Sequence, residues 1–146
     1  MLSLAGKNFT TGRAKFRDQS PGAGELTAKI LVKIEFPTLR GRWLAQLDTG
    51  SAYSMLDIEV ARALRMLDGD GEPVRIHTRL GLILGRLERV PLILVAEEGI
   101  SLEVDTTFLV SPDWPGKTFL GYTGFLDKLR IALDPLVNDF YFGEGG

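Results

Sequence analysis

WLAQLDTGSAYS, residues 43–54, is the most informative stretch of this sequence. Residues 43–47 have the apolar character of a strand, and Asp48, Thr49 and Gly50 follow it directly. An acid at the end of an apolar strand is unusual, because taking its charge out of water costs several kcal/mol unless a partner compensates. The three residues alone would also fit an ordinary Asp-Gly turn, so the surrounding pattern has to distinguish a turn from a site.

The surrounding pattern predicts a mostly-β domain. Alternating or β-branched segments typical of strands cover residues 26–36, 41–47, 74–80, 82–95, 102–110, 130–134 and 140–143. Short helices are expected over residues 55–67 and 123–129. A parallel α/β sheet would need regular crossover helices, so we expect a closed or strongly folded β-domain over residues 25–146. Residues 1–24 are polar and Gly-rich, which predicts a loose N-terminal arm or a peripheral strand.

Composition excludes several kinds of chemistry. The 146 residues carry a formal net charge of -2, which leaves no excess of Lys and Arg for a nucleic-acid partner. There are no cysteines, so thiolate nucleophiles and thiolate metal sites are excluded. His77 is the single histidine, and its alternating segment favours an ordinary half-exposed strand position. Carboxylates are therefore the expected base of any hydrolytic reaction.

The sequence predicts no cofactor, no metal and no membrane contact. Residues 68–72, DGDGE, resemble the start of a calcium loop but lack the rest of its ligand spacing. No apolar run reaches the ~20 residues that span a bilayer, and the first residues lack the basic and apolar regions of an export signal. We expect a soluble, cytoplasmic protein. Trp43 and Trp114 are expected to be packing residues.

Three segments together resemble the retropepsin-like aspartic peptidases, the family of retroviral proteases and their cellular and bacterial relatives. They are LDTGS (47–51), TRLGLILGRL (78–87) and FLGYTGFLDKLRIALD (119–134), and the resemblance extends from about residue 26 to residue 143. It implies a closed, barrel-like acid-protease fold with one or two short helices, active as a two-fold dimer. The family often has Arg and Asp where this chain has Tyr122 and Thr123, so an ion pair of those residues is not carried over.

The resemblance implies roles for the residues of the catalytic motif. Asp48 would be the acid and base of peptide-bond hydrolysis, and Thr49 would bond across to the equivalent loop of a second subunit. Gly50 would permit a tight backbone and donate to the carboxylate, and Ser51 would hydrogen-bond an oxygen of Asp48. Simple capping of the turn is the alternative for Thr49 and Ser51.

The resemblance also implies two supporting segments. Phe119, Leu120 and Gly121 would form a strand beneath the catalytic loop, with Gly121 allowing close approach of two backbones. Residues 78–85 are the candidate flap, a hairpin that closes over substrate and excludes water. The flap residues expected to contact substrate are Thr78, Leu80, Gly81, Leu82 and Gly85. An ordinary exposed hairpin is the alternative, in which the leucines at 80, 82 and 84 belong to the core.

The chain contains one Asp-Thr-Gly and no second Asp-Thr/Ser-Gly, whereas the mechanism needs two carboxylates. A two-fold homodimer would bring Asp48 against the partner subunit's Asp48, since a two-lobed enzyme would need about twice this length. The expected substrate is a peptide or unfolded protein, bound as an extended strand. Two alternatives stay open, because a fold does not guarantee a function. One is an inactive retropepsin-like module for peptide binding or dimerisation, and the other is a β-barrel binding domain in which Asp48 caps a turn.

Overall fold

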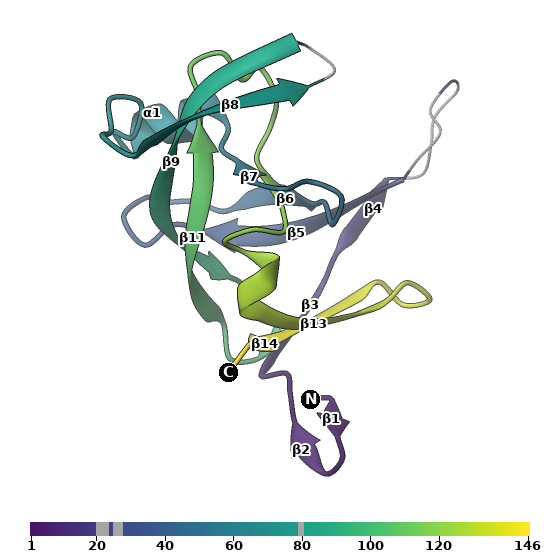
Figure 1. The fold of residues 1–146 in the computed structure, drawn as a ribbon. Helices are drawn as coiled ribbons and strands as arrows, with labels where there is room; N and C mark the ends of the chain where they lie inside the picture. Colours follow the sequence, from purple (N-terminus) through teal and green to yellow (C-terminus); the bar gives the residue numbers. More distant parts are fainter. Residues whose placement is uncertain (20–23, 25–27, 79–80) are drawn as a thin grey trace.

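The computed structural model describes residues 1–19, 24, 28–78 and 81–146 (Figure 1). In chain order its elements are β1 (Ser3–Leu4), β2 (Lys7–Asn8), β3 (Gly12–Lys15), β4 (Arg17–Gln19), β5 (Lys29–Glu35), β6 (Trp43–Leu47), β7 (Ser54–Met55), α1 (Ile58–Ala63), β8 (Glu72–Thr78), β9 (Gly81–Leu94), β10 (Glu98–Gly99), β11 (Leu102–Val110), β12 (Phe119–Leu120), the 3₁₀ helix η1 (Leu126–Lys128), β13 (Leu129–Asp134) and β14 (Asp139–Glu144). The expectation of a mostly-β domain with short helices is confirmed.

The largest sheet closes on itself. Its strand order is β4-β5-β6-β12-β7-β11-β9-β8, and a further pairing places Ile34 of β5 opposite Leu94 of β9. This pairing joins β5, β6, β12, β7, β11 and β9 into a ring. β4 and β8 extend beyond the ring as partners of β5 and β9, and the β8–β9 hairpin projects at the top of Figure 1.

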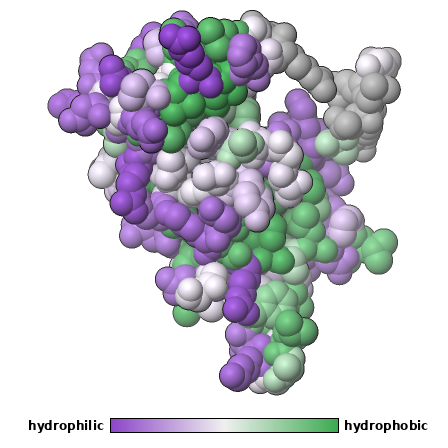
Figure 2. Space-filling model, in the orientation of Figure 1, coloured by the Kyte–Doolittle hydropathy of each residue, from purple (hydrophilic) through white to green (hydrophobic). Residues whose placement is uncertain are grey.

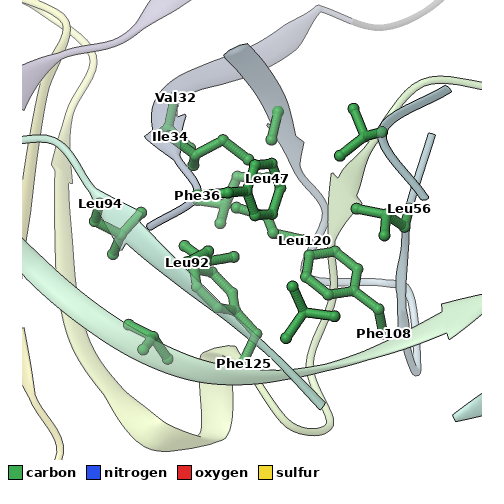
Figure 3. Close-up of a cluster of buried hydrophobic side chains, with 14 of the residues drawn as sticks. Val32, Ile34, Phe36, Leu47, Leu56, Leu92, Leu94, Phe108, Leu120 and Phe125 are labelled. Carbon is green, nitrogen blue, oxygen red and sulfur yellow. The ribbon is translucent and has the colours of Figure 1, made fainter. Parts of the chain in front are cut away.

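Apolar side chains from all parts of the ring fill its interior. Figure 3 shows Leu92 and Leu94 of β9 facing Leu120 of β12 and Phe108 of β11, with Phe125 between them. All five are between 0% and 1% exposed. Fully burying a side chain of this size contributes about 1.5–3 kcal/mol, so the interior is the main source of stability for the strands that carry Asp48.

A second sheet joins the two ends of the chain. Its order is β10-β3-β14-β13, so both edges of β14 are paired within the chain. Phe140 and Phe142 of β14 are 2% and 1% exposed, and Gly12 of β3 lies directly opposite Phe142. Residues 1–24 were expected to form an arm or a peripheral strand. Within them, the β1–β2 hairpin stands away from the body in Figure 1, whereas β3 belongs to this sheet.

The helix is shorter than the apolar spacing predicts. α1 begins after Asp57, whose side chain accepts a 2.8 Å hydrogen bond from the N–H of Glu59 and so caps the first turn. Met55, expected inside the helix, instead pairs in β7, and Arg65 has a φ of 58°, which ends the helical path. No helix in the described ranges is long and apolar enough to cross a membrane.

Candidate active site

β12 lies between β6 and β7 in the sheet and pairs with both strands that flank the Asp48 loop. Leu120 pairs in parallel with Leu47, and Phe119 pairs antiparallel with Met55. The N–H of Asp48 donates a 2.9 Å hydrogen bond to the carbonyl oxygen of Leu120, which is fully buried. The position of Asp48 is therefore set by backbone pairing to a buried strand, as expected of a strand beneath the loop.

Gly121 follows β12 at a point where two backbones touch. A Cβ on Gly121 would lie 2.6 Å from the carbonyl carbon of Tyr53, still closer to its oxygen, and 2.8 Å from the carbonyl oxygen of Ser51. The N–H of Gly121 donates a 2.9 Å bond to the hydroxyl of Ser54, which is 0% exposed. Ser54 is a supporting residue that sequence reasoning missed, because a serine after the motif gives no signal that its partner lies 67 residues away.

The Asp48 side chain is held by its own loop. Oδ1 accepts a 3.0 Å hydrogen bond from the N–H of Gly50, as the sequence predicts. Asp48 is half-buried, whereas Thr49 and Gly50 are exposed. Ser51 was expected to hydrogen-bond an oxygen of Asp48, and its backbone does so, whereas its hydroxyl donates to the carbonyl oxygen of Tyr53 at 2.7 Å. Its N–H donates to the Asp48 carbonyl oxygen at 3.3 Å.

The candidate flap is the end of the β8–β9 hairpin. Thr78 pairs with Gly81, and its hydroxyl donates to the Gly81 carbonyl oxygen at 3.0 Å. The φ of Gly81 is 105°, a conformation that other residues rarely adopt. Leu80 lies outside the described residues. Leu82 and Leu84 are each 49% exposed, so they are not core residues of the single chain, and an ordinary exposed hairpin stays the alternative to a flap.

Gly85 has a different environment from the rest of the flap. A Cβ at this position would lie 2.7 Å from the carbonyl oxygen of Val110 in β11. Its neighbour Ile83 is 3% exposed and packs with Met55 and Leu109. Gly85 therefore allows the hairpin to pack closely on β11, whereas Gly81 allows the chain to turn.

Two cavities adjoin the Asp48 loop. One, of about 420 Å³, lies between residues 50–53 of the loop and residues 75–78 of the hairpin. The other, of about 560 Å³, contains Asp48 and is bounded by β5 and β6. Trp114 and Phe119 line both cavities, with their rings edge to face at 5.3 Å. Trp114, expected only to pack, is thus also a wall of the candidate site, and its loop position gave no sign of this.

Among the described residues that line these cavities, Asp48 is the one carboxylate. No group of three or more His, Asp or Glu side chains in the described ranges is placed to hold a metal. The described part of one chain therefore contributes a single carboxylate beside two partly apolar cavities. No protein-family model and no curated protein matches the sequence.

Proposed function

We propose that this chain is one subunit of a homodimeric, retropepsin-like aspartic endopeptidase in which Asp48 and the partner subunit's Asp48 activate a water molecule. The observation that carries the proposal is the setting of Asp48. Asp48 follows β6, and its carboxylate accepts a hydrogen bond from the N–H of Gly50. Its backbone N–H bonds the carbonyl oxygen of buried Leu120 in β12, which lies between β6 and β7. Asp48 also borders a cavity large enough for peptide side chains.

The chemistry requires two carboxyl groups. Water has to lose a proton as it attacks the amide carbonyl, and a proton has to reach the carbonyl oxygen and later the leaving nitrogen. Two carboxyls held close together share one proton because both cannot ionise, so one acts as base while the other acts as acid. The Gly50 N–H hydrogen-bonds one carboxylate oxygen of Asp48 and does not occupy the other.

A two-fold dimer supplies the second carboxyl. Thr49 and Gly50 are exposed in the single chain, so the tip of the loop is accessible to an identical loop. The β8–β9 hairpin forms the opposite wall of the 420 Å³ cavity. In the proposed enzyme an extended peptide lies between this hairpin and the paired loops, and closure of the hairpin excludes water from the reaction.

The decisive experiment compares Asp48→Asn with the wild-type protein on a denatured protein and a peptide library. The amide keeps the shape of the side chain but cannot act as a base, so we expect normal folding and dimerisation with at least about a 100-fold loss of hydrolysis. Asp70→Asn is the matched control, because Asp70 is exposed and lies outside both cavities. Substantial hydrolysis by Asp48→Asn would reject the assignment.

The same experiment separates the two alternatives. Peptide binding without cleavage by the wild-type protein would indicate an inactive peptide-binding module. Absence of both binding and cleavage would leave a β-domain in which the Gly50 N–H and the Asp48 carboxylate form only a local turn.

A further inference from the structure

In the described part of the chain, three cationic side chains and one histidine line the two cavities. Arg75 and His77 of β8 line the cavity below the hairpin, and Lys29 and Lys117 line the cavity that contains Asp48. Among the described lining residues, Asp48 alone is acidic. The whole chain has 19 acidic residues against 17 Lys and Arg, so overall composition does not explain this local excess of positive charge.

Two of these cations make no ion pair in the described part of the chain, as is also true of several basic residues elsewhere, Lys7 and Arg40 among them. Six of the other basic residues make ion pairs of 2.5 to 2.9 Å, namely Arg13, Lys15, Lys33, Arg42, Arg62 and Arg89. In the described part of the chain, Lys29 and Arg75 make no ion pair, and Lys117 makes one 3.7 Å contact with Asp57 while its side chain is 94% exposed. Lys29 and Arg75 are therefore available as counter-charges for a ligand.

The rest of the lining combines apolar side chains with polar ones such as Gln46, Ser51 and Thr118. Trp114 and Phe119 separate the two cavities, and Met55 and Ile76 add apolar surface to the one below the hairpin. Figure 2 shows apolar surface beside hydrophilic side chains over the β8–β9 hairpin at the top of the view. A ligand that fits this lining has apolar side chains at the centre and anionic groups nearby.

We propose that the site selects acidic peptides, in which Asp or Glu residues lie within a few positions of an apolar residue at the bond to be cleaved. This inference rests on the proposed function, because it assigns the substrate class of that site. Cations on the walls raise the local concentration of an anionic peptide and pair with its carboxylates, and both effects weaken as salt screens the charges.

The test uses the Asp48→Asn protein, so that binding is measured apart from hydrolysis. Three labelled peptides share one apolar centre and carry flanking Glu, Gln or Lys residues, and their binding is followed by fluorescence anisotropy at low and high salt. We expect at least about tenfold tighter binding of the Glu peptide than of the Gln peptide at low salt, and a smaller ratio at high salt. Equal affinities for the Glu and Gln peptides, or no binding of any peptide, would overturn the inference.

Charge-removing variants locate the effect. Lys29→Gln and Arg75→Gln, made on the same background, should each reduce the Glu-to-Gln preference about three- to fivefold. Lys7→Gln and Arg40→Gln are the matched controls, because both residues are exposed and line neither cavity, and they should leave the preference unchanged. A preference that survives both cavity variants, or that falls equally in the controls, would contradict a role for these cations.

Failure of this inference can be distinguished from failure of the proposed function. If the wild-type protein cleaves the Glu and Gln peptides with equal kcat/KM, the charge selection is wrong and the peptidase assignment stands. If Asp48→Asn prefers the Glu peptide while the wild-type protein cleaves neither peptide, the binding preference stands and the peptidase assignment fails.

Discussion

Replacing Gly121 by alanine tests whether the close contact beneath the Asp48 loop holds the site together. The new Cβ would lie 2.6 Å from the carbonyl carbon of Tyr53 and 2.8 Å from the carbonyl oxygen of Ser51. Both obstacles are backbone atoms, so relief requires β12 or the loop to move, and such overpacking costs about 3 kcal/mol. Alanine also reduces the conformational entropy of the unfolded chain, which stabilises the folded protein by about 0.4–1 kcal/mol. The steric cost is larger, so the net loss is about 2 kcal/mol, or about 4–8 °C in Tm.

The assay is urea unfolding of Gly121→Ala beside Gly50→Ala. Gly50 lies in the same loop, but a Cβ there would meet only an oxygen of the Asp48 side chain, at 3.4 Å. We therefore expect Gly50→Ala to change stability by less than about 0.5 kcal/mol. Equal midpoints for the two variants would show that the loop and β12 can separate without cost, and would refute the idea that this contact positions Asp48.

Three further predictions concern the same framework. Ser54→Ala leaves the Gly121 N–H buried without its acceptor, so we expect a loss of about 1–3 kcal/mol in urea unfolding, and an unchanged midpoint would contradict it. Hydrogen bonds from Lys15, and to a smaller extent from Arg13, lower the pKa of Asp139 in the folded protein. The ionised Asp139 therefore stabilises the fold at pH values above the ordinary carboxyl pKa of about 3.9, and this stabilisation is lost as pH falls below that value. Asp139→Asn should thus lower Tm at pH 7 by an amount that shrinks below about pH 4, and a gap independent of pH would refute this. Specific activity, measured together with sedimentation, should fall on dilution through the dissociation range, because each subunit supplies only one Asp48. Full activity of a monomer would exclude the shared site.

Sequence patterns predict the strands of this protein better than its helix. The strand expected over residues 102–110 coincides with β11, because its alternation reflects one buried face. The helix expected over residues 55–67 is reduced to Ile58–Ala63. Met55 and Leu56 have helical spacing, but pairing of Met55 with Leu109 in β11 takes precedence over it. Local spacing cannot show such a partner, since the partner lies far along the chain.

In the candidate site too, contacts between residues close in the chain can be predicted from the sequence, whereas long-range contacts cannot. The hydrogen bond from Gly50 to Asp48, which the family resemblance implies, joins residues two apart in the chain and is present. The bond expected from Ser51 to an oxygen of Asp48 is made by the Ser51 N–H, whereas its hydroxyl donates to the carbonyl oxygen of Tyr53. The place of Trp114 in both cavities depends on how a loop folds over the ring, which its sequence does not encode locally.

The pairing of β3 with β14 constrains the order in which this protein can be completed during synthesis. β3 is made early, but its main partner consists of residues 139–144, so until these are translated only the two-residue β10 can pair with it. The strands of the ring all lie between Lys29 and Leu120 and have their partners earlier. Phe16, buried in the finished core, follows β3 directly. A ribosome that pauses before residue 139 therefore holds a chain in which β3 lacks its main partner, with apolar surface exposed to chaperones.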